Sequence, residues 1–574
     1  MKKTMTLILV LLVAMTTRAQ YFHHLYANGM TTGNGMVTKY ISDGHVIAGF
    51  NPKVISVART DVKGNFSSAD NFNLLYVLKD AATDQNLYIT GTKITELSTK
   101  DGYIVMGDYY FKNPNTGVTE YGIFYLLLKS DGNPSLVIGY QHPKLEIPLK
   151  LTAITESVNS PGDIYATGLV EYDGSPRDMF AMRIKAYGSL SWDYIYDFSW
   201  LEKPENQVWV SDILESPYTN DIDIVGRGNQ DGLWIDLDQS NGSVQSVNFY
   251  DLGKDDRFNA IAVSSDPNTG KGYILCGTST ANTGYNQVWA MKTKTLKTSV
   301  LWSFIYAGKA TAKEQDGIDI IGRLNTGGKY EYYLAAVCHD YPNDIEDNLV
   351  FKIPSDGVMT SVNDVFLYPF SNNQEHVESI DMGKALGTTG ISLYSNFSST
   401  TTGAQNMLIT HAYFNGVTAC NYDITYGKPY RFDPKQYDEK TQEIEKLVEQ
   451  KIYVSDIYKS DDKEICYAKT VLGGSNARLA QNAVNGGITE GITHVYPNPV
   501  TGNATLHIAT TAEAAETVQV SITDMAGRTV WSRSYSLQAG DNDLQVVTGE
   551  IATGVYDVSI ARNAGTEHHK ITVH

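Results

Sequence analysis

A short turn motif recurs along most of the chain and restricts its possible folds more than any other feature. It reads "DVKGNF", "KSDGNPS", "KAYGSLS", "DQSNGSV", "KTLKTSV", "PSDGVMT" and "YFNGVTA". Six copies carry a glycine and the fifth carries Lys297 instead; the glycines are Gly64, Gly132, Gly188, Gly242, Gly357 and Gly416. A tight hairpin needs a positive φ, which glycine reaches at low cost. The copies recur about every 57 residues, which predicts seven repeats of one structural unit.

Each repeat contains four short β-type runs. One unit consists of "LTAITES" (151–157), "DIYATGLV" (163–170), "MFAMRIK" (179–185) and "SWDYIYDF" (191–198). Four-stranded units are typical of propeller blades, and one such sheet buries its two faces only when neighbours cover them. We therefore predict an all-β chain in which residues 20–430 form a seven-bladed β-propeller. Eight blades, two smaller sheets and a stacked β-solenoid are the alternatives.

The repeats also resemble the β-propeller repeats of secreted bacterial proteins. The best matches pair "GDIYATG" with "DMFAMRIK" and "GYILCGT" with "QVWAMKTK". The resemblance covers roughly residues 21–430 and implies the same propeller fold.

Residues 1–19 have the features of a secretory signal peptide. Two lysines precede an apolar run from Leu7 to Met15, and cleavage is expected after Ala19. That run is too short to span a bilayer and no later stretch is long enough, so we expect no membrane span. The formal net charge of −19 disfavours nucleic acid and anionic lipid as partners.

The composition changes after the seventh repeat. Residues 431–472 are highly charged and are interpreted as an accessory element packed on the propeller. Asp433 and Pro434 suit a helix start, and one helical face would carry Tyr437, Ile444, Leu447, Val448 and Ile452. The isoleucine–tyrosine alternation from Ile452 to Tyr458 favours a strand instead. The small polar residues of 473–492 predict a linker.

The last segment, 493–574, has a pattern of its own. Alternating runs such as "ATLHI", "VQVSITD" and "YDVSIA" predict a small immunoglobulin-like β-sandwich. Its motifs resemble the type A C-terminal sorting domain of Bacteroidetes cargo of the type IX secretion system. The positions that carry the resemblance are Pro497, Asn498, Pro499, Gly502, Asp524, Gly527, Arg528, Gly554, Tyr556 and Lys570. Ile551 stands where that family usually has leucine, and it preserves the apolar contact.

The resemblance implies a route for the chain. The signal peptide would take it to the periplasm, and the type IX machinery would recognise the C-terminal domain and carry the chain across the outer membrane. The sorting domain is usually removed, and the cargo is released or attached to surface lipopolysaccharide. We therefore expect a secreted or outer-membrane-surface location.

The sequence offers no recognisable catalytic constellation. H-E-x-x-H, G-x-S-x-G and P-loop motifs are missing, so we assign no catalytic residue, no cofactor and no metal ligand. The oxygen-rich stretches 220–232 and 341–348 lack EF-hand spacing, which favours solvated loops over calcium sites. Cys420 and Cys466 flank the accessory element and are expected to form a disulfide, with two separate buried thiols as the alternative.

The longer loops should share one face of the propeller. Loops between second and third strands, such as 339–348, lie with the inter-blade connections, and long loops on a rigid scaffold usually carry binding residues. We place a ligand there, near Asp256, Glu314, Asp340, Tyr341 and Glu375. The preferred function is binding of a host or surface ligand, either protein or glycan. The alternative is a secreted peptidase or glycosidase with its site at the propeller channel.

Overall fold

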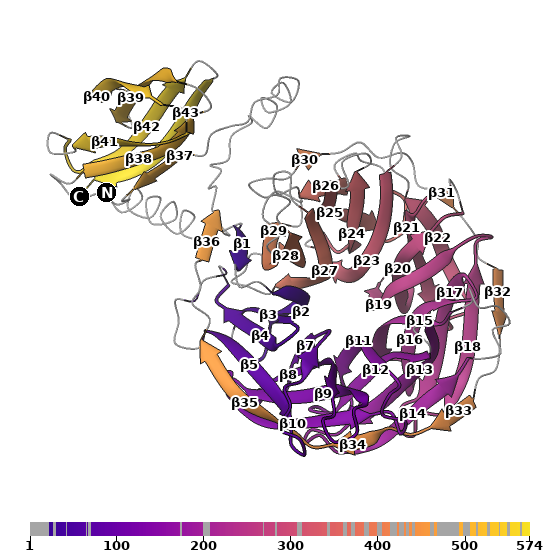
Figure 1. The fold of residues 1–574 in the computed structure, drawn as a ribbon. Coiled ribbons are helices and arrows are strands. Elements are labelled where there is room, and N and C mark those ends of the chain that lie inside the picture. The colour runs from indigo at the N-terminus through magenta and orange to yellow at the C-terminus, as the bar shows by residue number, and fades with distance from the viewer. Residues whose placement is uncertain are drawn as a thin grey trace, which may run out of the picture. The chain divides into compact units, whose positions relative to one another are not determined.

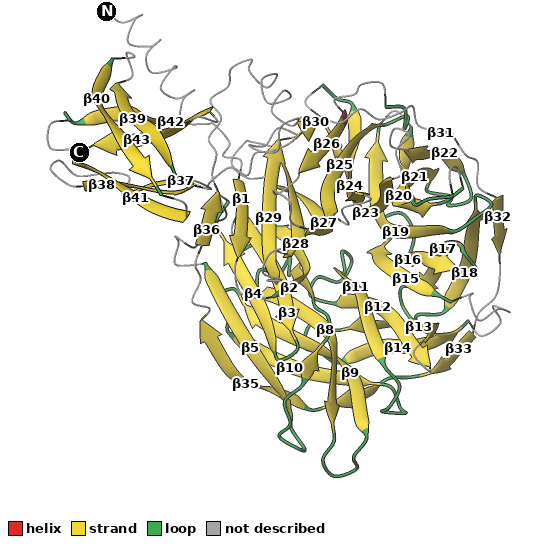
Figure 2. Cartoon of the chain, turned by 45° about the horizontal axis from the view of Figure 1, so that its top comes forward, coloured by secondary structure: helices red, strands yellow, loops and turns green. Residues whose placement is uncertain are grey.

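The computed structural model divides the chain into two compact units, Met1–Val471 and Leu472–His574. All named elements are β-strands, which confirms the all-β prediction (Figures 1 and 2). The structure describes residues 22–467 and 493–573 with gaps, the longer of which are 199–206, 307–312, 341–344, 369–373, 384–389, 399–404, 414–421, 424–429 and 497–504. The expected signal peptide (1–19) and linker (473–492) lie outside the described residues.

The first unit contains seven antiparallel sheets, which we number in chain order. Sheet 1 joins β2 (Thr31–Thr38), β3 (Gly44–Asn51), β4 (Val54–Thr60), β5 (Phe72–Asp80) and β35 (Ile452–Lys459). Sheet 2 joins β6 (Tyr88–Ile89), β7 (Lys93–Glu96), β8 (Gly102–Lys112), β9 (Thr119–Lys129), β10 (Pro134–Gln141) and β34 (Val448–Gln450). Sheet 3 joins β11 (Leu149–Glu156), β12 (Ile164–Tyr172), β13 (Ser175–Ile184), β14 (Leu190–Asp197) and β33 (Gln442–Glu445).

The remaining four sheets repeat this plan. Sheet 4 joins β15 (Trp209–Glu215), β16 (Asp221–Gly228), β17 (Asp231–Asp238), β18 (Val244–Asp251) and β32 (Lys435–Asp438). Sheet 5 joins β19 (Asp256–Asp266), β20 (Gly270–Ser279), β21 (Gln287–Lys294), β22 (Val300–Tyr306) and β31 (Tyr430–Arg431). Sheet 6 joins β23 (Lys313–Leu324), β24 (Tyr330–Asp340), β25 (Ile345–Pro354), β26 (Val365–Tyr368) and β30 (Tyr422–Asp423). Sheet 7 joins β27 (Gln374–Gly383), β28 (Gly390–Ser398), β29 (Gln405–Tyr413), β1 (Phe22–Tyr26) and β36 (Glu464–Tyr467).

The seven sheets follow one another around a common centre (Figure 1). The first strand of each sheet contacts the first strand of the next, with β7 in this position in sheet 2, and β27 of sheet 7 contacts β2 of sheet 1. A hydrophobic cluster fills each of the seven interfaces between neighbouring sheets. Both faces of a sheet are therefore covered, which explains why a run such as Ile164–Val170 in β12 is buried at every position.

The fourth strand of sheet 7 comes from the N-terminal end of the described chain. Strand β1 pairs with β29, and Leu25 lies opposite Leu408. The turn at Gly416, from which we expected this strand to follow, lies outside the described residues. The repeat pattern did not predict that a distant segment would complete the last sheet.

Residues 422–467 form an outer belt (orange in Figure 1). Its strands β30 to β36 add an outermost strand to sheets 6, 5, 4, 3, 2, 1 and 7, in that order. The expected helix within 431–472 is wrong for the described residues, since 442–445 and 448–450 are strands. The strand expected from Ile452 to Tyr458 is confirmed as β35. The belt forms short strands because each one lies along the open edge of a sheet, whose backbone groups supply its hydrogen-bond partners.

The second unit contains two small sheets. One joins β37 (Thr493–Tyr496), β38 (Thr505–Ala512) and β41 (Gly540–Val547). The other joins β40 (Thr529–Leu537), β39 (Glu516–Asp524), β42 (Gly554–Arg562) and β43 (Gly565–Val573). Both sheets contribute to one hydrophobic core, with Leu506 and Val546 from the first and Val520 and Val558 from the second.

Candidate functional site at the loop end of the sheets

The two ends of the sheets in the first unit are held differently. We call the end with the turns between third and fourth strands the hairpin end, and the opposite end, with the connections between sheets, the loop end. At the hairpin end, a tyrosine hydroxyl of one sheet donates to a turn carbonyl of the next sheet. The pairs are Tyr76–Gly132 (2.6 Å), Tyr140–Gly188 (2.5 Å), Tyr196–Gly242 (2.7 Å), Tyr250–Lys297 (3.4 Å) and Tyr306–Gly357 (2.9 Å). The hairpin end therefore joins neighbouring sheets.

Two of the turn glycines show why that residue is needed. Gly132 and Gly242 have φ values of 83° and 76°, in the left-handed region. A Cβ atom at Gly132 would lie 2.8 Å from Leu74, and one at Gly242 would lie 2.6 Å from Trp192. Both neighbours belong to the preceding sheet, so these turns are packed against it as well as hydrogen-bonded to it.

Lys297, which replaces glycine in the fifth turn, reaches into sheet 4. Its ammonium nitrogen lies 2.5 Å from Asp223 Oδ1 and 2.5 Å from Asp236 Oδ1. Burial raises the pKa of Asp223 to about 8, although the Lys297 charge opposes this. Burial lowers the pKa of Lys297, but the two carboxylates outweigh it and leave that pKa above its usual value. This charge cluster joins sheets 4 and 5.

Three carboxylates meet at the loop end between sheets 4 and 5, and we call them the acidic triad. Asp231 begins β17, Asp251 ends β18 and Asp256 begins β19. One oxygen of each carboxylate lies within 4.8 Å of the others. Sets of carboxylate oxygens suit hard divalent cations such as Ca²⁺. The triad is thus the group of described residues whose geometry could hold a metal ion.

Asp256 is fully buried within the triad. Burial raises its pKa to about 7, and the charges of Asp231 and Asp251 act in the same direction. Hydrogen bonds from Ser279 Oγ (2.5 Å) and from the Leu252 amide (2.7 Å) oppose the rise. A proton or a bound cation would relieve the repulsion among the three carboxylates.

A row of charged side chains crosses the loop end of sheets 5, 6 and 7. Arg257 lies 2.7 Å from Asp316, and Asp316 lies 3.7 Å from His339 Nε2. Glu346 pairs with both histidines: its Oε1 lies 3.3 Å from His339 Nδ1, and its Oε2 lies 3.1 Å from His376 Nδ1. We call these five residues the charged row; each remains partly exposed to solvent.

The two histidines of the charged row have raised pKa values. The hydrogen bond to Asp316 is the main cause for His339, and burial opposes it. Burial lowers the pKa of His376, but Glu346, Glu378 and Asp316 outweigh that effect. The hydrogen bond from His376 in turn lowers the pKa of Glu346. The two histidines therefore keep their proton to a higher pH than an unperturbed histidine does.

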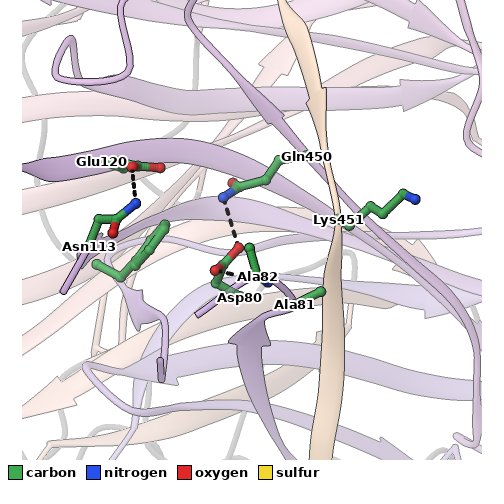
Figure 3. A pocket seen from close by; sticks show the side chains of 8 residues that line it. Asp80, Ala81, Ala82, Asn113, Glu120, Gln450 and Lys451 are labelled. Atoms are coloured by element: carbon green, nitrogen blue, oxygen red, sulfur yellow. Dashed lines mark hydrogen bonds between the residues drawn. The ribbon is translucent and has the colours of Figure 1, made fainter. Parts of the chain in front are cut away.

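A cavity of about 270 Å³ lies at the loop end of sheets 1 and 2 (Figure 3). Its lining residues are Asp80, Ala81, Ala82, Phe111, Asn113, Glu120, Gln450 and Lys451. Asn113 Nδ2 donates to Glu120 (2.7 Å) and Gln450 Nε2 donates to Asp80 (3.1 Å), as the dashed lines show. Because its polar groups largely satisfy one another, we give this cavity less weight than the charged groups of sheets 4 to 7.

The structure places the five sequence-derived binding residues as follows. Asp256 lies in the acidic triad, although it is fully buried. Glu314 is half-buried in β23, opposite His339 of the charged row, and Asp340 ends β24. Tyr341 lies outside the described residues. Glu375, next to His376, is fully buried, as Asp256 is, and the assignment of both to a ligand site stays a prediction.

Sequence reasoning missed most members of the two charged groups. It identified the segments 253–259, 308–317 and 339–348 as connections and loops, but not Arg257, Asp316 or His339 within them. These residues come from different sheets, and no local spacing connects them. The signal that could have found them is their common position at the loop end of successive repeats.

The second unit shows how its turn motif is built. Asp524, at the end of β39, accepts hydrogen bonds from the Arg528 amide (3.0 Å) and from Arg528 Nε (2.8 Å). Tyr556 is buried and its hydroxyl donates to the Ala552 carbonyl at 2.6 Å. Ile551 is buried in the core, as expected for an apolar contact.

The remaining motif positions of this unit are only partly visible. Gly554 begins β42, where a Cβ atom would lie 3.3 Å from the Tyr556 ring. Lys570 lies opposite Asp557 in the pairing of β42 with β43. Pro497, Asn498, Pro499, Gly502 and Gly527 lie outside the described residues. Cys420 does too, and the Cys466 side chain is not described, so the expected disulfide stays a prediction.

Comparison with known families identifies this C-terminal unit. Residues 494–574 match the family model "Secretion system C-terminal sorting domain". The match supports the resemblance stated above: the chain is type IX secretion cargo of the kind found in Bacteroidetes, with a sorting domain recognised by that machinery. The sorting tail implies export and a secreted or cell-surface location.

No curated protein matches the chain. Among the described residues, we find no helix with the length and apolar character that crossing a bilayer requires.

Proposed function

We propose that the first unit is a seven-bladed β-propeller that binds a host or surface ligand at its loop end. The seven sheets, the core cluster in each interface and the contact of β27 with β2 support the propeller part of this proposal. Closure without a free interface is the arrangement that lets every sheet bury both faces.

The contrast between the two ends of the sheets carries the binding part of the proposal. At the hairpin end, polar groups form hydrogen bonds between neighbouring sheets, such as the bond from the Tyr196 hydroxyl to the Gly242 carbonyl. The loop end instead gathers ionisable side chains with perturbed pKa values, including Asp256, whose pKa burial raises to about 7, and His339, whose pKa is raised by Asp316 and Glu346. Ionisable groups with perturbed pKa values that meet on loops of a rigid scaffold are typical of binding sites.

The same proposal extends to domain organisation and route. Residues 1–19 would be the signal peptide, 20–430 the propeller, 431–472 an accessory element on it, 473–492 a linker, and 493–574 an immunoglobulin-like β-sandwich. The outer belt supports the accessory assignment, because it pairs with all seven sheets. After export the chain would be released or attached to surface lipopolysaccharide.

A hydrolase with its site at the propeller channel is the weaker candidate. Asp212 and Asp319, on first strands, have pKa values raised by burial to about 6 and about 7. Each carboxylate, however, accepts a backbone N–H of the next sheet at 2.9 Å, Asp212 from Ile261 and Asp319 from Ile380. These bonds give both residues a structural role, so we favour binding.

The test is a binding screen with the exported chain, run beside generic peptidase and glycosidase assays. Immobilised protein is offered host extracellular proteins and glycans, and any ligand found is measured again with Arg257→Ala and His339→Ala. Binding should weaken in both variants when it is measured well below the melting temperature of each protein. The control is Tyr187→Ala, at a hairpin-end residue that is 83% exposed. Equal loss in the control, or turnover of a substrate without stable binding, would contradict the proposal.

A further inference from the structure

Three tyrosines form a row across the loop end of sheet 2. Tyr88 in β6 lies opposite Tyr110 in β8, and Tyr110 lies opposite Tyr121 in β9. The rings of Tyr88 and Tyr110 are stacked, with centroids 5.2 Å apart and planes 13° apart. The rings of Tyr110 and Tyr121 are 6.0 Å apart at 39°. We call these residues the tyrosine row.

The row ends at Tyr88 with a ring that is open to solvent. Strand β6 is an edge strand of sheet 2, and Tyr88 is 40% exposed. Within the described part of the chain, the Tyr88 ring stacks only on Tyr110, on one side. The other side of the Tyr88 ring is therefore available to a flat ligand surface.

The hydroxyl groups of the row are also available. In the described part of the chain, none of the three hydroxyls has a hydrogen-bond partner in the protein. This differs from the hairpin end, where Tyr76 is fully buried and its hydroxyl is bonded to Gly132. The tyrosines of the row thus combine an apolar ring with unused donors and acceptors.

Charges close to the row are already engaged. Asp108, two residues before Tyr110 on the same face of β8, accepts the Leu151 amide at 3.2 Å and feels the charge of Lys150. The Lys150 ammonium lies 5.1 Å over the ring of Trp209, which is 39% exposed at the start of β15. Asp108 and Lys150 are therefore engaged with other groups of the protein.

We propose that the tyrosine row is a stacking platform for a neutral saccharide chain. A pyranose ring offers an apolar face for the open side of Tyr88 and hydroxyl groups for the unused phenols of the row. The net charge of −19 of the chain disfavours a strongly anionic ligand. The proposal rests on the binding function proposed above and assigns it a ligand class.

A purely structural role is the competing explanation, because cross-strand aromatic pairs stabilise sheets by about 0.2–1 kcal/mol each. The two explanations differ in what substitution changes. Loss of a structural pair lowers the melting temperature and leaves affinity unchanged. Loss of a platform lowers affinity, and Tyr88→Phe, which keeps the ring, should retain most of it.

The experiment uses the exported full chain and four neutral probes, namely cellohexaose, chitohexaose, maltohexaose and mannohexaose. Binding is measured by isothermal titration calorimetry, and tyrosine absorption is recorded during titration to report on ring stacking. We expect at least one probe to bind and Tyr88→Ala to weaken it at least about tenfold. Tyr187→Ala and Tyr285→Ala, at exposed tyrosines on sheets 3 and 5, should bind like the parent.

The outcomes separate this inference from the proposed function. If a probe binds the parent and binds Tyr88→Ala and Tyr110→Val with unchanged affinity, the saccharide platform is overturned, because that probe binds elsewhere. Failure of all four probes while a protein ligand binds also overturns it, and leaves the proposed binding function in place. Failure of every saccharide and every protein ligand overturns both. Loss in Tyr88→Ala with normal melting and normal controls supports the platform.

Discussion

The hydroxyl of Tyr196 donates a 2.7 Å hydrogen bond to the carbonyl oxygen of Gly242, in the hairpin of the next sheet. Both partners are removed from water, since Tyr196 is fully buried and the turn packs on Trp192. The same bond recurs between five pairs of neighbouring sheets. The repeated tyrosine and turn therefore join neighbouring sheets, in addition to the role of the turn within its own sheet.

Tyr196→Phe removes this hydrogen bond and keeps the ring. A buried carbonyl that loses its donor costs about 1 kcal/mol, and we expect a loss of that size in the free energy of unfolding. Chemical denaturation of the variant and of the parent measures it. Tyr187→Phe, at an 83% exposed position, should leave stability unchanged. Equal stability of all three proteins would show that the hydroxyl contributes nothing.

Lys297→Met removes the cation shared by Asp223 and Asp236. Both carboxylates are buried, and an uncompensated buried charge costs about 3–5 kcal/mol. We expect the free energy of unfolding, measured by chemical denaturation, to fall by that amount. The loss should be smaller at acid pH, where the carboxylates are protonated. Lys185→Met, at an exposed lysine near the equivalent turn of sheet 3, is the matched control. If both variants unfold alike, the cluster does not join the sheets.

The charged row should make stability depend on pH. Folding raises the pKa of His339 and His376 above the unfolded value of 6.5, so their contribution is fully present below pH 6.5. It is lost as the pH rises through the two folded values. Melting temperature measured upward from pH 6.5 should therefore fall more in the parent than in Glu346→Gln. Parallel curves for the two proteins would refute a role for the row.

Truncation after Gly491 should stop export at the periplasm. The deleted part contains the sorting domain, whereas the outer belt ends at Tyr467 and stays complete. Fractionation of cells that produce the truncated and the full chain tests this. Normal delivery of the truncated chain to the surface or the medium would contradict a sorting role for residues 494–574.

The sequence predicted the regular part of the fold well. The run "DIYATGLV" became β12, and the turn at Gly188 has the positive φ that the motif requires. Such features follow from local physics, because a strand needs alternation or burial and a tight turn needs glycine. The all-β class and the C-terminal sorting domain could be predicted for the same reason: their signals are contiguous in the sequence.

The outer belt could not be predicted in this way. Leu447 and Ile452 are buried as expected for a helical stripe, but Val448, assigned to the same stripe, is 48% exposed. The helix-like spacing of these apolar residues arises because β34 pairs with sheet 2 and β35 pairs with sheet 1. The partner edges lie hundreds of residues earlier in the chain, for example Tyr140 opposite Glu449, so no local pattern shows them.

The positions of the loops could be predicted better than the burial of the residues within them. The loops chosen from length and polarity do lie near charged groups, and Asp256 and Glu314 stand beside members of them. Glu375 was chosen for its place in a polar connection, yet it is fully buried while its neighbour His376 faces the charged row. Strand alternation decides which of two adjacent polar residues reaches the site, and a one-residue register is hard to fix from sequence alone.

The outer belt sets the order in which the sheets lose their open edges. Synthesis runs from the N-terminus, so all fourth strands exist before residues 422–467 can cover them. The belt reaches sheet 6 first and sheet 7 last, where β36 pairs with β1. A chain interrupted before residue 446 would leave sheets 1, 2 and 7 with bare edges, each a template for pairing with another chain. Protection of these three edges against pairing with another chain therefore depends on residues 446–467, which are synthesised after every strand of the seven sheets that they cover.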